Sequence, residues 1–414
     1  MSKKFVQYGA GNIGRGFLGQ LFGQAGYDVQ FIDVNMEVID ALNHDKRYPI
    51  NIISKISPQE IWIENASGVN GMDIEAVADS IATANIMATA VGVNILPRIV
   101  PPLVEGLRRR LAIGNKNPLN IIICENLIDA DKLLHKLIND QLTDEEKPII
   151  NGILGLVEAS IGRMVPVMTD IQRQGNVLRV CVESYCELPI DKAAFKGEIP
   201  KVSHLYPYSP FELYIKRKLF IHNMGHALTA YLGNLMHYEY IYEAIENPYI
   251  KIIVQRAMSE SALALSKHFD IPLCDVLEHI SDLLIRFSNR ALGDTILRVG
   301  RDTQRKLSTT DRFTGAIKLC EAEGISPVYA SLGIAAGLFF DCPDDNGTLA
   351  VRTKLQESGI DAVLKDLCGI AKENISYNYI TTYFALLKNN VDLSSLLSQA
   401  EQIQENILKI KNVL

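Results

Sequence analysis

Features that define several large classes of protein are absent from this sequence of 414 residues. No apolar run approaches the eighteen or more residues that a membrane-spanning helix requires, and the first residues lead directly into a strand pattern that leaves no room for a signal peptide. Cysteine is scarce: there are seven, an odd number, and none forms a CxxC pair. The eight histidines contain no HExxH pattern. We therefore predict a cytoplasmic protein with no disulfide framework and no metal site.

An excess of positive charge is also missing. The formal net charge is −7 and the sequence pI is about 5.7, which argues against a nucleic-acid partner. There is no internal repeat and no low-complexity segment. With 48% hydrophobic residues, a chain of this length can bury two separate cores. We expect a small-molecule substrate, no membrane partner, and a monomer or small homo-oligomer.

A glycine-rich turn between two strand patterns is the first motif. The apolar stretch Phe5–Tyr8 leads into Gly-Ala-Gly-Asn-Ile-Gly, a helical pattern follows, and Tyr27–Asp33 is a second strand that ends in an acid. In this context the glycines allow a tight turn, a close approach of the backbone to a pyrophosphate, and close packing of helix on strand. The free N–H groups of the helix start attract phosphate. The predicted cofactor-binding residues are Gly9, Ala10, Gly11, Asn12, Ile13 and Gly14.

Asp33 stands at the end of the second strand, where a carboxylate accepts hydrogen bonds from the adenosine ribose hydroxyls. A carboxylate there repels a 2′-phosphate, so we predict NAD as the cofactor in preference to NADP. Another buried strand pattern, 85–92, ends in small residues. Because ligands bind at the carboxyl ends of the strands in a doubly wound sheet, we expect Thr89, Val91 and Gly92 to form a floor for the cofactor.

Further strand patterns complete the N-terminal half. Residues 119–124 form a buried strand followed by Asn126, which is either an amide donor at the reacting centre or an ordinary turn residue. Segments 149–158 and 177–187 look like additional strands of the same sheet, and 49–54 and 61–64 like a hairpin. Prolines at 200, 207 and 210 mark the end of this half. We predict a Rossmann-like, doubly wound α/β domain over residues 1–208 and a mostly α-helical substrate domain over 209–414.

The second motif opens the helical half. A helical pattern at 210–236 carries Lys218, Asn223 and His226. At about 100° per residue, the asparagine lies about 140° and the histidine about 80° around the helix from the lysine. A base, an amide and an imidazole therefore share one sector of one element, which suits proton-transfer chemistry. The alternative is an ordinary helix with a snorkelling lysine and two satisfied polar residues.

A basic segment follows between two of the later helices. Arg301, Arg305 and Lys306 occur close together with hydroxyl residues interleaved, and guanidinium groups match the oxygens of a phosphate. We predict that these three residues bind a phosphate monoester of the substrate. A surface loop held together by internal Asp–Arg pairs is the alternative.

With both motifs in place, the sequence resembles the polyol-specific long-chain dehydrogenase/reductase family over nearly its whole length. The glycine turn, Cys124-Glu-Asn126 and the spacing Lys218-x4-Asn223-x2-His226 carry the likeness, which is greatest to the branch that acts on mannitol 1-phosphate. The resemblance implies that Lys218 is the catalytic base and that Asn126 and Asn223 stabilise a developing oxyanion. It also implies that His226 holds a substrate hydroxyl and that no metal takes part.

The implied reaction is the reversible NAD-dependent oxidation of mannitol 1-phosphate to fructose 6-phosphate. A related polyol, or a hexuronate such as tagaturonate or fructuronate, is an alternative substrate, because the basic segment favours an anion without separating phosphate from carboxylate. A non-catalytic NAD-binding protein is a third interpretation. The sequence departs from the family at Gly162, where aspartate is usual, at Leu188, where tryptophan is usual, and at His222, which is usually apolar.

Overall fold

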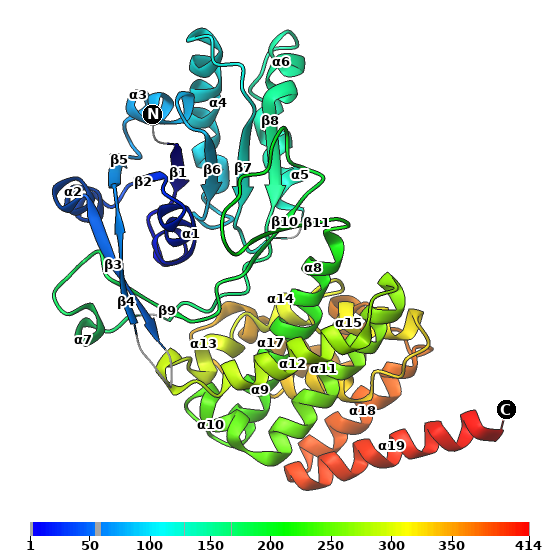
Figure 1. The fold of residues 1–414 in the computed structure, drawn as a ribbon. Coiled ribbons are helices and arrows are strands. Elements are labelled where there is room, and N and C mark those ends of the chain that lie inside the picture. The colour runs from blue at the N-terminus through cyan, green and yellow to red at the C-terminus, as the bar shows by residue number, and fades with distance from the viewer. Residues whose placement is uncertain (1–2, 54–58, 128, 167, 414) are drawn as a thin grey trace. The chain divides into compact units, whose positions relative to one another are not determined.

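The chain forms two compact units, Met1–Tyr214 and Ile215–Leu414, coloured blue to green and green to red in Figure 1. The computed structural model describes residues 3–53, 59–127, 129–166 and 168–413. The sequence-based prediction had placed the boundary after residue 208.

A six-stranded parallel sheet organises the first unit (Figure 1). Its strand order, β5-β2-β1-β6-β7-β8, is that of a doubly wound dinucleotide-binding sheet. Tyr8 pairs with Ile32 and Thr89, and Thr89 pairs with Ile123, so the turns after four strands leave the sheet at one edge. The strands are β1 (Lys4–Tyr8), β2 (Asp28–Asp33), β5 (Ala66–Asn70), β6 (Ile86–Thr89), β7 (Leu119–Ile123) and β8 (Leu154–Glu158).

Both faces of this sheet are covered, as the apolar strands require. Successive residues of a strand point to opposite faces, so Phe5 belongs to one core cluster and Val6 to the other. The Phe5 face packs on the π-helical turn η1 (Gly14–Leu18), α1 (Gly19–Gln24) and α2 (Met36–Asp45). The Val6 face packs on α3 (Ile74–Ala82), α4 (Leu96–Ala112) and α5 (Ala130–Asn139).

Two small sheets complete the unit. In one, β3 (Arg47–Ile53) pairs antiparallel with β4 (Gln59–Glu64) and parallel with β9 (Val180–Glu183). This confirms the hairpin, although Ser54, at the end of its predicted first strand, lies outside the described residues. The other sheet joins β10 (Leu188–Asp191) to β11 (Leu205–Tyr208). The remaining helices are α6 (Glu146–Ile153) and α7 (Asp170–Arg173).

Three strand predictions in this unit were wrong or incomplete. The sequence analysis missed β5, because its small residues carry little strand signal. The strand needs glycine at position 68, since a Cβ there would lie 2.9–3.0 Å from atoms of Ile39 in α2. The predicted strand 149–158 is half helix, because α6 runs to Ile153 and only the rest forms β8. The predicted strand 177–187 shrinks to β9, which pairs with β3 and does not extend the main sheet.

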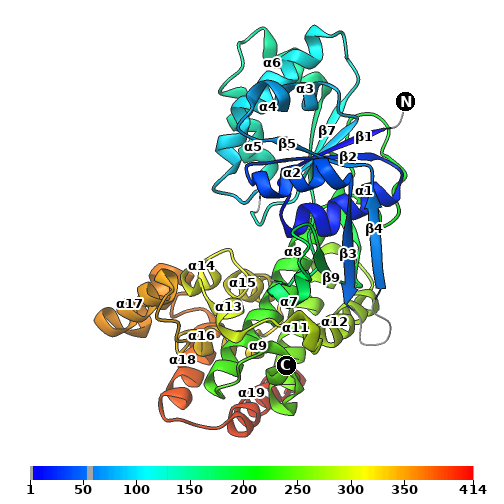
Figure 2. The same ribbon diagram turned by 90° about the vertical axis from the view of Figure 1, so that its left-hand side faces the viewer.

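The second unit is helical, as predicted. Its central helix α16 is buried at all ten positions and lies among α9, α11 and α18 (Figure 2). Within the described residues, none of the helices combines the length and apolar composition needed to span a bilayer. After α8 (Glu212–Arg217), which crosses the boundary, the elements are η2 (Lys218–Asn223), α9 (Met224–Leu235), α10 (Ile241–Glu246), α11 (Pro248–Phe269), α12 (Leu273–Phe287), η3 (Arg290–Leu292), α13 (Ile296–Gly300), α14 (Thr303–Leu307), α15 (Thr314–Ala322), α16 (Val328–Gly337), α17 (Asn346–Val363), η4 (Leu364–Cys368), α18 (Ile375–Lys388) and α19 (Leu393–Val413).

Candidate active site

The glycine turn after β1 is shaped by contacts that no side chain would permit. Gly9 has φ +96°, and a Cβ there would lie 2.5 Å from the carbonyl oxygen of Ala90. A Cβ at Gly14 would lie 2.0 Å from the carbonyl oxygen of Gly9, so helix and strand pack in direct contact. Gly11, in contrast, has open space where its side chain would be. The turn therefore offers exposed backbone to a ligand at its middle glycine.

Asp33, at the end of β2, is bound to the glycine turn itself. One carboxylate oxygen accepts a hydrogen bond of 2.6 Å from the Ala10 N–H, and the other accepts one of 2.9 Å from the Asn35 N–H. The side chain stays partly exposed, so both oxygens keep lone pairs for further donors. Burial, and secondarily the charge of Asp33, raises the pKa of Tyr8 to about 12.

The helix that follows the turn contains a π-helical segment with an identifiable cause. The Gly19 N–H bonds to the carbonyl of Gly14, five residues back. The carbonyl that a regular α-helix would use, that of Arg15, instead accepts a hydrogen bond of 2.8 Å from the Tyr48 hydroxyl. The next carbonyl, that of Gly16, accepts one of 2.9 Å from the Arg163 guanidinium. Two side chains from elsewhere in the unit thus hold the helix in its π form.

A residue that sequence reasoning did not single out joins the next two turns. The buried carboxylate of Glu125 accepts hydrogen bonds of 2.9 Å from the Val91 N–H and 2.8 Å from the Gly92 N–H. The backbone N–H groups of Val91 and Gly92 are therefore already used in hydrogen bonds within the protein. Thr89 is buried and its hydroxyl has no hydrogen-bond partner. Asn126 follows Glu125 in an exposed turn.

Lys218 and Asn223 lie at the two ends of the π-helical segment η2, which continues into α9. The prediction assumed α-helical geometry, and this was wrong. The N–H of Met224 bonds to the carbonyl of Leu219, five residues back. Because the hydrogen bonds of a π turn span five residues and the turn is wider than an α turn, Asn223 lies about one turn above Lys218 and closer to its side than in an α-helix. His226 is three residues further along a regular α-helix, where i and i+3 are neighbours.

This side of the helix is less buried than its surroundings. From Leu219 to Gly233 every residue is buried except Asn223 and His226, which are partly exposed, as is Lys218 just before them. The helix is therefore enclosed by protein apart from the stripe that bears the three predicted residues.

His226 has two close side-chain neighbours, Phe287 and Asp294. Its ring stacks on Phe287, with centroids 4.8 Å apart and an interplanar angle of 11°. Its buried Nε2 has no hydrogen-bond partner and lies 3.5 Å from Oδ2 of Asp294. The other oxygen of Asp294 accepts a hydrogen bond from Arg298. Burial, together with the nearby cations Arg298, Lys306, Arg312 and Arg286, holds the pKa of His226 well below its usual range, so the imidazole is neutral at pH 7.

His222 lies one turn before His226, a four-residue spacing that occurs in zinc sites and that the sequence prediction did not take into account. The two rings have centroids 6.2 Å apart. Among the described residues, no three His, Cys, Asp or Glu side chains are arranged to hold a metal ion.

The predicted phosphate-binding residues differ in their placement. Arg301 is exposed. Arg305 is also exposed, and it is held between Asp302 at 2.5 Å and Asp311 at 3.0 Å, as in the alternative of internal Asp–Arg pairs. Lys306 is buried, its ammonium donates to the backbone carbonyls of Val299 and Arg301, and burial lowers its pKa to about 7. Its ammonium therefore supports the backbone of the segment and does not face solvent.

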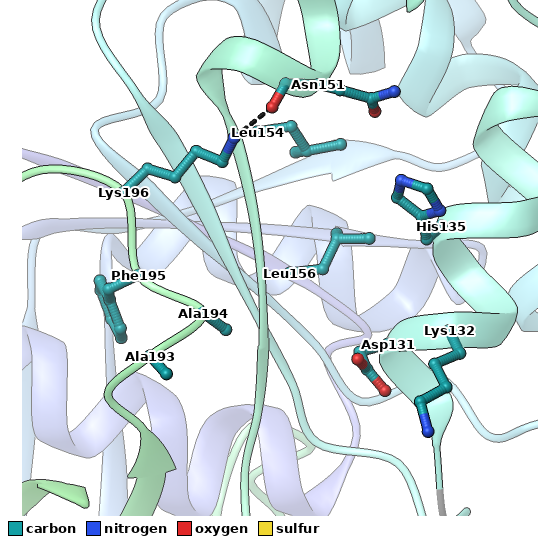
Figure 3. A pocket seen from close by; sticks show the side chains of 10 residues that line it. All are labelled: Asp131, Lys132, His135, Asn151, Leu154, Leu156, Ala193, Ala194, Phe195 and Lys196. Atoms are coloured by element: carbon teal, nitrogen blue, oxygen red, sulfur yellow. Dashed lines mark hydrogen bonds between the residues drawn. The ribbon is translucent and has the colours of Figure 1, made fainter. Parts of the chain in front are cut away.

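Two cavities in the first unit contain none of the predicted residues. One of about 510 Å³ lies beside β8 and α5 (Figure 3), where Lys196 donates a hydrogen bond to the Asn151 carbonyl. The other, of about 420 Å³, lies at Glu37 and Arg173. The larger cavity is lined by Asp131, Lys132, His135, Asn151, Leu154, Leu156, Ala193, Ala194, Phe195 and Lys196.

A doubly wound sheet with a glycine turn after its first strand is the fold of a dinucleotide-binding domain, and here it is followed by a helical unit. The comparisons with known proteins agree. Residues 3–204 match the model of the mannitol dehydrogenase Rossmann domain, and residues 211–399 match that of the mannitol dehydrogenase C-terminal domain. The chain belongs to the mannitol dehydrogenase family, whose members are oxidoreductases that act on a CH–OH group. The resemblance and fold class expected from the sequence are confirmed.

Individual relatives are similar over most of the chain. A mannitol-1-phosphate 5-dehydrogenase from Brevibacillus brevis is 36% identical over 88% of this chain and 93% of its own length. One from Bacillus licheniformis is 36% identical over 91% and 98%. Among solved structures, a ternary complex of Pseudomonas fluorescens mannitol 2-dehydrogenase with NAD and D-mannitol covers 97% of this chain and 95% of its own, with a TM-score of 0.75 and 15% identity. That last likeness concerns the fold alone.

Proposed function

We propose that this protein catalyses the reversible, NAD-dependent oxidation of mannitol 1-phosphate to fructose 6-phosphate. The observation that carries the proposal is the stripe of Lys218, Asn223 and His226 along one partly exposed side of an otherwise buried helix. The substrate is inferred from the relatives at 36% identity that bear the name mannitol-1-phosphate 5-dehydrogenase.

The residues of the first unit fit a nicotinamide dinucleotide. The backbone at Gly11 is open to a pyrophosphate, and the buried hydroxyl of Thr89 lacks a partner that a ligand could supply. Asp33 keeps acceptor capacity for ribose hydroxyls, and its charge disfavours a 2′-phosphate, which supports NAD over NADP. When bound, NAD accepts a hydride from the substrate carbon and NADH returns it.

Lys218 is the proposed base, with Nζ taking the proton of the substrate hydroxyl. An ordinary lysine, of pKa about 10.4, is almost fully charged at pH 7. A cationic cofactor beside this amine would favour the neutral form that a base requires. Negative charge developing on the substrate oxygen would accept hydrogen bonds from the amides of Asn223 and Asn126, and one such donor is worth roughly 2.7–4 kcal/mol.

The phosphate of the substrate requires cationic partners, and we assign this role to Arg301 and Arg305. Both side chains are exposed. Lys306 contributes indirectly, because its ammonium fixes the carbonyl of Arg301 from the buried side. A guanidinium that already bonds to carboxylates, as Arg305 does, has five N–H donors and can still offer some to phosphate oxygens.

The experiment that tests this function is NADH oxidation with fructose 6-phosphate, fructose, tagaturonate and fructuronate measured side by side. We expect the highest kcat/KM with fructose 6-phosphate and a lower rate when NADPH replaces NADH. Turnover of a hexuronate in preference to fructose 6-phosphate would assign the basic segment to a carboxylate. Binding of NADH without turnover of any of the four substrates would refute the catalytic assignment.

A further inference from the structure

The buried side of His226 contains an acid that the sequence motif does not include. Asp294 lies between η3 and α13, far along the chain from η2 and α9. Its side chain is only 8% exposed, and Oδ2 lies 3.5 Å from the Nε2 of His226. We infer that Asp294 is a positioning residue, which holds His226 in the tautomer that carries its proton on Nε2 and leaves Nδ1 as the acceptor. This inference rests on the proposed function for its catalytic meaning.

Electrostatics selects this tautomer over the other. A neutral imidazole has one N–H and one lone pair on its two nitrogens. If the proton were on Nδ1, the lone pair of Nε2 would face a carboxylate oxygen at 3.5 Å in a buried site. With the proton on Nε2, the same carboxylate is an acceptor, and a shift of roughly 0.5 Å completes a hydrogen bond of ordinary length. A buried N–H with no partner is destabilising, which favours that shift.

Two neighbours restrict how the pair can rearrange. Phe287 stacks on the imidazole almost in parallel, which opposes rotation of the ring out of its plane. Arg298 donates to Oδ1 of Asp294 and so fixes which carboxylate oxygen faces the histidine. Nε2 is buried and faces Asp294, although the side chain of His226 is 15% exposed, so we assign the proposed contact with a substrate hydroxyl to Nδ1. In this tautomer Nδ1 accepts a hydrogen bond from a substrate hydroxyl.

Replacing Asp294 with asparagine should reverse the tautomer. Arg298 can donate only to an oxygen, so the Asn carbonyl takes the position of Oδ1 and the NH₂ group faces Nε2. An NH₂ donor requires a lone pair on Nε2, which moves the proton of His226 to Nδ1. Asp294→Ala removes the acceptor without supplying a donor, and therefore leaves both tautomers accessible.

The direct test is two-dimensional ¹H–¹⁵N NMR of ¹⁵N-histidine-labelled protein without substrate, with the signals of His226 assigned through His226→Gln. We expect the Nε2–H tautomer in the wild type and the Nδ1–H tautomer in D294N. The control is Asp341→Asn, which alters an exposed Asp–Arg pair with Arg352 and should leave the spectrum unchanged. The Nδ1–H tautomer in the wild type, or no change in D294N, would overturn the inference whether or not the protein turns over fructose 6-phosphate.

Kinetics distinguish positioning from a merely structural role. If Asp294 only stabilised the fold, alanine would be at least as harmful as the nearly isosteric asparagine. We expect the reverse: D294N should lower kcat at least tenfold more than D294A, with NADH affinity and melting temperature closer to wild type in D294N. Equal or greater loss in D294A would assign Asp294 to stability alone. Should D294A fail to fold, the tautomer measured in D294N still decides the matter.

Discussion

Glu125→Gln isolates the effect of one carboxylate on the geometry of two turns. The carboxylate of Glu125 accepts from the N–H groups of Val91 and Gly92 at 2.9 and 2.8 Å and is buried. Glutamine keeps one acceptor and turns an NH₂ group toward the second N–H, so one charge-assisted bond is lost and the other loses its charge assistance. Hydrogen bonds to charged groups contribute about 1.5–3 kcal/mol, and the freed N–H lies in a turn that is at least partly exposed, where water can hydrate it. We expect the free energy of unfolding of the first unit to fall by roughly 3 kcal/mol.

Two assays follow from this magnitude. For a unit of this size, about 1 kcal/mol corresponds to a shift of roughly 2–4 °C in melting temperature, so the loss should lower Tm by roughly 6–12 °C. Hydrogen exchange of a peptide covering residues 85–95 should become faster, because the amides of Val91 and Gly92 lose their shared acceptor. NADH affinity should also fall, since these turns form the edge of the sheet at which the cofactor is expected.

A matched substitution shows what loss of one surface carboxylate does by itself. Glu64 forms an exposed ion pair with Arg47 at 3.6 Å, and such pairs contribute at most about 1 kcal/mol. Glu64→Gln should therefore change Tm by only a few degrees and leave exchange at 85–95 unaltered. If Glu125→Gln behaves like Glu64→Gln in both assays, the carboxylate does not hold these turns and its burial has another cause.

Three further predictions concern the proposed reaction. Lys218→Ala should cut turnover by orders of magnitude, because it removes the proposed base. NADH affinity, measured by fluorescence titration, should change little. Near-normal turnover would exclude Lys218 as the base. Arg301→Ala should raise KM for fructose 6-phosphate far more than KM for fructose in steady-state assays, and equal losses for both sugars would remove the phosphate role. Asp33→Asn should increase the ratio of kcat/KM for NADPH to kcat/KM for NADH roughly tenfold, which corresponds to about 1.4 kcal/mol, because it removes the charge that repels a 2′-phosphate. If this ratio does not change, residues other than Asp33 select the cofactor.

What could be predicted from the sequence was chiefly what local pattern determines. The glycine turn was recognisable because a strand, three glycines and a helix follow one another in the chain, and the structure gives each of Gly9 and Gly14 a close contact that explains it. The third strand of the sheet, β5, was missed because its residues are small and polar. Its place next to β2 depends on close packing of Gly68 against α2, which periodicity along one strand does not reveal.

The parts that escaped prediction depend on residues distant in the chain. Nothing between Gly14 and Leu18 signals a π turn, because the groups that divert its carbonyls belong to Tyr48 and Arg163. Glu125 stood in a motif that was noted, yet its partners became visible only when β6 and β7 were paired. Asp294 offered only an acid in a Gly-Asp-Thr turn, and no rule of spacing connects it with His226.

The π-helical turn η1 begins at the last glycine of the first motif, and η2 contains two residues of the second, whereas the π-helical turn η4 carries none of the predicted residues. A π turn is rare because its hydrogen bonding is less favourable than that of an α-helix, so its presence at a motif points to a specific requirement. For η2 the requirement is alignment. In an α-helix Lys218 and Asn223 would diverge by about 140°, whereas the wider π turn brings them closer to one side, and the following α-helical turn adds His226 to that side. In the proposed reaction, the base, the amide and the imidazole would then reach one substrate carbon from a single rigid element. The local distortion of the helix, as much as the identity of the three residues, therefore sets the geometry of the proposed site.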